Sequence, residues 1–169
     1  MEELLHKLEM QTEAFDKLKN VKMEFGLFEE DSSKKVSYRT FDLEGNNIGK
    51  DTATLYEIMY LTDKGTISLP SYKILDKLGL LIMNRMDDFI NKVLDRILKE
   101  EKINKVIEEE LKAFESYCNL FVVGQAVDLT IQDYNRIDSS INGENTELKT
   151  IYDLNDLKKC IKCKFFLKS

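Results

Sequence analysis

The sequence predicts an α+β fold in which a small antiparallel sheet packs against a long helical hairpin and an N-terminal helix. Two segments, 21–28 and 161–168, alternate apolar and polar residues, which is the pattern of strands with one buried face. Between them, residues 72–134 carry apolar side chains at spacings of three and four, the period of helices. Because each strand has to cover its apolar face with helices, this combination favours the α+β class.

The first element is an amphipathic helix, which we expect over residues 2–19. Its apolar side chains recur at helical spacing, and they are Leu4, Leu5, Leu8, Phe15 and Leu18. This apolar side of the helix packs either on the sheet of the same domain or on a neighbouring subunit. His6 lies in sequence near three glutamates, so we expect it on the solvated side of this helix.

Residues 29–52 are expected to form an extended loop or strand-like excursion, because a polar run is followed by alternating residues and then by a glycine- and asparagine-rich turn. Residues 54–61 fit either a short helix or a strand, and we favour a short helix that ends near Thr62. Asp51 or Thr52 is the expected N-cap of this helix, since side chains of both types accept hydrogen bonds from free amide groups.

The pattern changes at the only proline, Pro70, which follows a turn at Gly65-Thr66. The residue before a proline is disfavoured in helical angles, so the helical region 72–134 should begin after it, with Ser71 as the cap. Gly79 is expected to mark a kink or a close contact. The polar stretch 99–102 divides the region into two antiparallel helices. A short helix over 152–159 should precede the last strand.

A chain of 169 residues predicts a single domain, 1–169. The net charge of −6 disfavours specific nucleic-acid binding, because phosphate neutralisation needs a basic face. No stretch has the roughly 18 to 20 consecutive apolar residues that cross a bilayer, so no membrane partner is expected. Three cysteines, an odd number, indicate a reducing compartment.

No catalytic signature occurs, and we expect a protein that is not an enzyme and needs neither a cofactor nor a metal. Cys160 and Cys163 form a C-x-x-C pattern, but Cys163 lies in a strand and is expected in the core, as is Cys118 on a helix. The carboxylates at 100–101 and 108–110 are expected on the solvated side of a helix.

One charge pattern stands apart from the acidic chain, because residues 158–169 contain five lysines and no acid. The lysines are Lys158, Lys159, Lys162, Lys164 and Lys168. They either protect an edge strand from aggregation or form a basic strip at an assembly interface.

The run from Leu55 through Gly65, Thr66 and Pro70 resembles a family of tailed-phage virion-morphogenesis proteins, which includes neck, head–tail joining and tail-completion proteins. In that family a first strand, an apolar segment, a Gly-Thr turn and a proline lead into a helical region. The segment 145–154 and the strand that follows are similar to the end of the family pattern. The arginine after the proline and a late glycine are absent from this sequence.

The resemblance implies a structural virion protein that forms an oligomeric ring at the head–tail junction and is assembled in the bacterial cytoplasm. Its partners would be other copies of itself and neighbouring neck, connector and tail proteins, met through the loop 29–52 and the lysine-rich strand 161–168. Two alternatives stay open. One is a tail-terminator ring protein, and the other is a soluble adaptor or regulatory protein that binds a partner through the helical hairpin 72–134.

Overall fold

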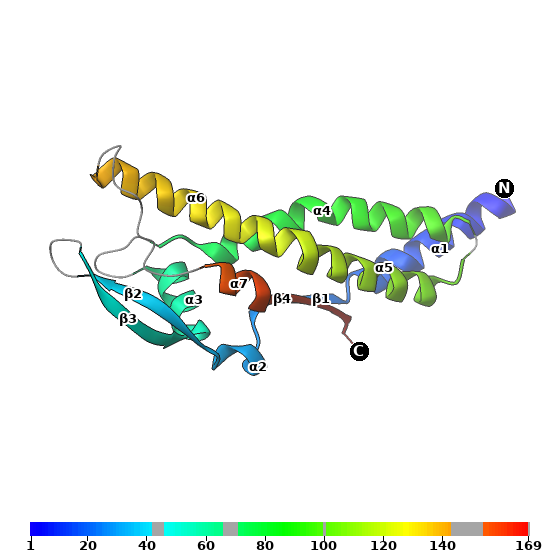
Figure 1. Cartoon of the computed structure of the whole chain (residues 1–169). Helices are drawn as coiled ribbons and strands as arrows, with labels where there is room; N and C mark the ends of the chain where they lie inside the picture. Colours follow the sequence, from blue (N-terminus) through cyan, green and yellow to red (C-terminus); the bar gives the residue numbers. More distant parts are fainter. Residues whose placement is uncertain (42–45, 66–70, 100, 143–153, 169) are drawn as a thin grey trace. The chain divides into compact units, whose positions relative to one another are not determined.

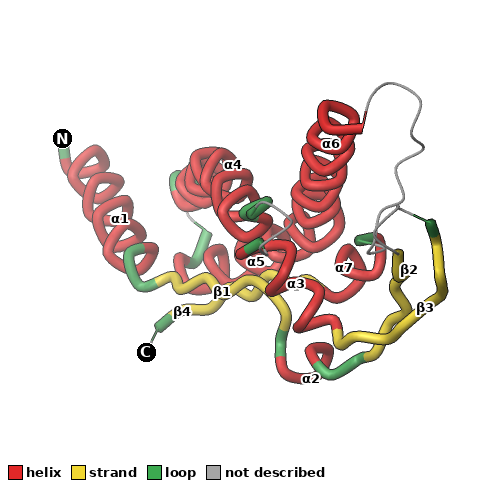
Figure 2. The backbone as a smooth tube through the Cα atoms, turned by 90° about the vertical axis from the view of Figure 1, so that its left-hand side faces the viewer, coloured by secondary structure: helices red, strands yellow, loops and turns green. Residues whose placement is uncertain are grey.

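The computed structural model describes residues 1–41, 46–65, 71–99, 101–142 and 154–168 (Figure 1). It confirms the α+β class, with long helices and two small antiparallel sheets. Strand β1 pairs with β4, and β2 pairs with β3 (Figure 2). In chain order the elements are α1 (Glu2–Leu18), β1 (Val21–Leu27), α2 (Glu29–Ser32), β2 (Lys35–Phe41), β3 (Asn47–Thr54), α3 (Leu55–Lys64), α4 (Ile74–Ile97), α5 (Ile103–Tyr117), the π-helical turn η1 (Cys118–Val122), α6 (Val123–Asn142), α7 (Asn155–Cys160) and β4 (Ile161–Leu167).

The chain divides into two compact units. The first unit comprises Met1–Phe25, Gly79–Val122 and Cys163–Ser169, and the second comprises Gly26–Leu78 and Val123–Lys162. One boundary falls inside helix α4 and another falls where η1 passes into α6. The expectation of a single domain over 1–169 stays a prediction.

Residues 79–97 of α4 and helix α5 form an antiparallel helical hairpin in the first unit, which is part of the hairpin predicted over 72–134. The ring of Phe89 stacks on Phe114 with centroids 5.1 Å apart, and Phe114 also meets Phe165 of β4 at 5.1 Å. Arg96, which follows Phe89 in α4, contacts Glu110, which precedes Phe114 in α5, so the two helices run in opposite directions. The aromatic stack therefore joins α4, α5 and β4 in one core.

Gly79 marks a close contact, as the sequence suggested. A Cβ atom at this position would lie 3.3 Å from Cζ of Phe25 in β1. That separation is tighter than ordinary van der Waals contact between carbon atoms. The absence of a side chain at Gly79 lets the Phe25 ring pack against the backbone of α4.

The β1–β4 sheet is antiparallel, and its far edge is covered by side chains. Lys168 donates its backbone N–H to the carbonyl of Asn20 at 2.7 Å, which places the end of β4 beside the start of β1. On the opposite edge of β4, the Asn119 side chain accepts from Cys163 N–H at 2.7 Å and donates to Cys163 C=O at 3.0 Å. The Glu115 carboxylate accepts from Phe165 N–H at 2.8 Å. Two side chains from α5 and η1 thus stand where a third strand would pair.

In the second unit, the expected excursion over 29–52 is a short helix followed by a β-hairpin. Strands β2 and β3 pair antiparallel from Lys35 opposite Thr54 to Phe41 opposite Asn47. The hairpin leads directly into α3, whose N-cap is Thr54 and not Asp51 or Thr52. Thr54 Oγ1 accepts from Glu57 N–H at 3.2 Å, and the Glu57 carboxylate accepts from Thr54 N–H at 2.8 Å. Because this reciprocal pair satisfies two free amides, it fixes the start of α3.

The predicted cap of the next helix is also corrected. Helix α4 begins at Ile74, three residues beyond Ser71, and the Ser71 hydroxyl donates instead to the carbonyl of Asp63. The Asp63 carboxylate, at the end of α3, accepts from the N–H of Leu75 at 3.0 Å. An acid from the preceding helix therefore caps α4.

Candidate functional site

The most unusual surface in the first unit is the apolar side of α1, which faces solvent. The exposed fractions run from 46% for Phe15 to 62% for Leu4, with Leu5 and Leu8 between them. The only fully buried residue of the helix is Ala14. At 3.6 residues per turn, Leu4, Leu8 and Leu5 lie about 80°, 120° and 180° from Ala14 around the helix. The expectation that this side packs on the domain's own sheet is therefore not met.

An open groove runs along α1 beside these leucines, and its border is acidic. Leu5 and Leu8 form its apolar part and Thr12 lies beside them, while Glu9, Glu13 and Asp16 line its edge, with Lys17 and Asn20 at the end. Lys17 is held in place, because its ammonium group pairs with Glu13 at 2.9 Å and donates to Asn104 of α5 at 2.6 Å. A segment that fills this groove would meet an apolar floor and a row of carboxylates.

The five lysines of the C-terminal segment do not form one uniform strip. In the second unit, Lys158 forms an ion pair with Asp128, and Lys162 pairs with Asp31 at 2.9 Å. Lys159 is exposed. In the first unit, Lys164 is half-buried and Lys168 is exposed. Whether these lysines contact another protein stays a prediction, but Lys158 and Lys162 already have acidic partners within the chain.

Asp31 is a buried acid in the segment 29–52, which the sequence predicts to be an extended loop or strand-like excursion. Its side chain is almost fully covered, and Lys34 and Lys162 both contact its carboxylate. Hydrogen bonds from Lys34 and then from Lys162 hold the pKa of Asp31 below its usual range. The same contact raises the pKa of Lys162. Asp31 therefore stays ionised and ties helix α2 to the start of β4.

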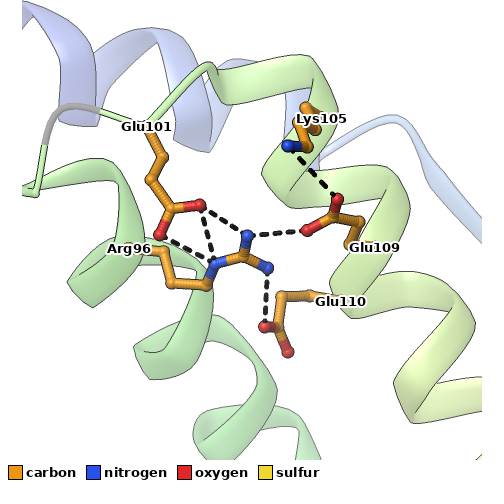
Figure 3. A network of polar contacts seen from close by, with 5 residues as sticks. All are labelled: Arg96, Glu101, Lys105, Glu109 and Glu110. Carbon is orange, nitrogen blue, oxygen red and sulfur yellow. Dashed lines mark hydrogen bonds and ion pairs between the residues drawn. The ribbon is translucent and has the colours of Figure 1, made fainter.

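A second ionic cluster surrounds Arg96 at the turn between α4 and α5 (Figure 3). The guanidinium donates to Glu101 through Nε at 3.1 Å, to Glu109 through one terminal nitrogen at 2.7 Å and to Glu110 through the other at 3.1 Å. Lys105 approaches Glu109 at 3.8 Å from the other side. Three of the glutamates expected to be merely solvated therefore converge on one arginine.

The Arg96 cluster should make stability depend on pH. Hydrogen bonds from Arg96 lower the pKa of both Glu101 and Glu109. A carboxyl group whose pKa is lowered by folding stabilises the folded state above its ordinary pKa, and that contribution is lost as the pH falls through the lowered value. We expect Arg96→Met to lower the melting temperature clearly at pH 7 and much less at pH 3.

Thermal melts of both proteins between pH 3 and pH 7 measure this difference. Arg85→Met is the matched control, because Arg85 is an exposed arginine of the same helix that forms no ion pair within the described part of the chain. An Arg96→Met deficit that is the same at both pH values would contradict the prediction.

A small hollow of about 210 Å³ lies between α4 and α5. Phe89 and Phe114 form its floor, and both rings belong to the core. Its rim combines both signs of charge and the edge of an exposed tyrosine, from Arg85, Asp88, Lys92, Glu110 and Tyr117. It holds no serine, cysteine or histidine, so the lining offers no activated nucleophile of the common kinds.

The cysteines are buried and unreactive. Cys118 and Cys163 lie in the core, as predicted, and Cys160 is buried as well. Burial raises the pKa of the Cys118 thiol to about 12 and that of Cys163 to about 11, so neither is a thiolate near neutral pH. His6 is exposed, as expected. No group of three or more potential metal-ligating side chains occurs among the described residues.

The residues that carried the family resemblance are only partly described. Gly65 ends α3 with a φ of 81°, a conformation that favours glycine. Thr66, Pro70 and nearly all of segment 145–154 lie outside the described residues. Within the described helices, none combines the length and apolar character needed to cross a membrane.

Comparison with known proteins gives no relative. No protein-family model matches the chain, and neither a curated protein nor a solved structure is significantly similar to it.

Proposed function

We propose that this protein is a structural assembly subunit and not an enzyme, and that the apolar side of α1 docks onto a neighbouring protein. The exposure of Leu4, Leu5, Leu8 and Phe15 carries this proposal. Contiguous apolar side chains that face solvent are typical of interaction sites, because covering them removes apolar area from water. A helix of this kind gains stability when a partner supplies the missing packing.

The acidic residues that border the groove on α1 indicate the charge that the partner should carry. Glu9, Glu13 and Asp16 lie beside the apolar floor of the groove. An interface gains specificity and association rate from opposite charges, so the partner should present apolar residues flanked by lysine or arginine. A nonspecific apolar surface would lack this selectivity.

In its specific form, the proposal is a ring of copies at the head–tail junction of a tailed phage or phage-like particle. The order of elements and the sequence resemblance support this form, which includes the neck, tail-completion and tail-terminator variants. The neighbours would be other copies of the chain together with neck, connector and tail proteins. Electron microscopy and mass spectrometry of purified particles test it, and particles that lack the chain would contradict it.

The docking role of α1 has a direct mutational test. We expect Leu4→Ser combined with Leu8→Ser to weaken association with the neighbouring virion protein by at least about tenfold, since two apolar contacts are lost. Leu80→Ser is the matched control, because Leu80 on α4 is 62% exposed, as Leu4 is. The binding constant is measured with purified proteins. Equal effects of the α1 and Leu80 substitutions would contradict the role of α1.

A second candidate function is a soluble adaptor that binds a partner through the helical hairpin. It is favoured by the exposed residues at the end of α5 and in η1, where Leu120 is 73% exposed and Tyr117 and Phe121 lie 5.4 Å apart. Under this alternative, Leu120→Ser would abolish binding to a cellular partner and the α1 substitutions would not.

A further inference from the structure

Strand β1 has an open edge. The backbone groups of successive residues in a strand point to opposite edges. Because the carbonyl of Asn20 accepts from Lys168, even-numbered residues of β1 face β4. Val21, Met23 and Phe25 consequently direct their N–H and C=O groups to the other edge. No strand within the described chain pairs there, so this edge is a template for another strand.

The two outer edges of the β1–β4 sheet differ in their hydrogen bonding. Asn119 and Glu115 occupy the outer edge of β4 with three hydrogen bonds at 2.7, 3.0 and 2.8 Å. For the outer edge of β1, no backbone or side-chain hydrogen bond from any described residue is found. The sheet can therefore be extended on the β1 side only.

We propose that β1 pairs antiparallel with β1 of a second copy, about a twofold axis that passes through Met23. In this register Lys22 lies opposite Glu24 of the second copy, and Glu24 lies opposite its Lys22. Both side chains are exposed in the first unit. The twofold pairing is self-complementary, because the same contact is made twice.

The charges select this register over its neighbours. Moving the axis by one residue toward the N-terminus places Lys22 opposite Lys22, and moving it toward the C-terminus places Glu24 opposite Glu24. Like charges directly opposite each other destabilise a sheet, and opposite charges stabilise it. The register centred on Met23 is the one that avoids both clashes and forms two ion pairs.

The backbone geometry agrees with this choice. Three residue pairs in this register exchange both backbone hydrogen bonds, which gives about six bonds in total. One pair is Met23 with Met23 of the second copy, and the other two are Val21 with Phe25 on either side of the axis. Lys22 and Glu24 then fall at the narrow pairs, where Cα atoms are about 4.5 Å apart and side chains interact most closely. Val21, Met23 and Phe25 keep their side chains on the face that carries Phe25 against Gly79.

This dimer does not rest on the proposed function, because its contacts are made by β1 and not by the leucines of α1. The test is the oligomeric state of the whole chain, measured by sedimentation velocity over a concentration series. We expect a dimer that Lys22→Glu or Glu24→Lys weakens by at least about tenfold, since each change places like charges opposite each other. The exchange K22E together with E24K should restore the dimer.

Circular dichroism of each variant confirms that the fold is retained. A wild-type chain that stays monomeric at the highest concentration would overturn the proposal, and so would a double exchange that fails to restore dimerisation. Dissociation by L4S/L8S but not by K22E would also overturn it, because the dimer would then use α1.

Cysteine cross-linking tests the register without placing like charges opposite each other. A mixture of Lys22→Cys and Glu24→Cys chains should form a disulfide-linked heterodimer on mild oxidation, because the two Cα atoms are within disulfide range. Either variant alone should cross-link several-fold less, since identical residues are offset along the strands. The native cysteines are buried and do not compete. Equal cross-linking in all three samples would contradict the register.

Discussion

Phe114→Ala should lower the free energy of unfolding of the first unit by about 3–5 kcal/mol, which is the usual cost of removing a large buried aromatic side chain. Phe114 is 8% exposed, and its ring contacts Phe89 and Phe165, each with centroids 5.1 Å away. One ring thus joins α4, α5 and β4. Its removal leaves a cavity at the place where all three elements meet.

Denaturant unfolding followed by circular dichroism measures this loss. Phe121→Ala is the control, because Phe121 lies in the adjacent turn η1 and is 62% exposed. Its substitution should change the free energy of unfolding by less than about 1 kcal/mol. If the two variants were equally stable, Phe114 would not be the centre of this core.

Asn119→Ala should destabilise the first unit by about 1–3 kcal/mol, because it leaves the N–H and C=O of Cys163 without their partner. The Asn119 amide supplies both an acceptor and a donor to that one residue. Asn119→Asp retains the acceptor but points a carboxylate at the Cys163 carbonyl. This variant should recover stability as the pH falls, because a protonated carboxyl group can donate again.

Unfolding experiments and hydrogen exchange at the Cys163 amide measure these effects. Asn84→Ala, on an exposed position of α4, is the control and should leave both quantities unchanged. Protection of the Cys163 amide that is unaffected by Asn119→Ala would show that the edge of β4 is held in another way.

The strands and helices could be predicted from the sequence because their patterns are local. The alternation in β1 and β4 and the three–four spacing in α4 and α5 need no knowledge of distant residues. The cap of α3 was predicted wrongly, although Thr54 followed by Glu57 is a capping-box signature that precedes an apolar run. That spacing identifies Thr54 as the N-cap.

The ionic contacts and the exposed side of α1 could not be predicted, because they depend on residues that are far apart in the sequence. Nothing near Asp31 indicates that Lys162 will cover it. The apolar periodicity of α1 shows which side chains lie on the same side of the helix. It does not show that the small residue Ala14, and not this apolar side, is the buried part of the helix. Packing, and not periodicity, decides which side of a helix meets the rest of the protein.

The side chains that occupy the edge of β4 also limit how far this sheet can grow. A sheet with two free edges can add strands from other molecules without end, which is the route to fibrils. Here Asn119 and Glu115 terminate one edge. When the β1 strands of two copies pair, the outer edge of β1 is occupied in both molecules. The Asn119 amide and the Glu115 carboxylate thus allow two copies to pair through β1 and prevent the sheet from adding strands at β4.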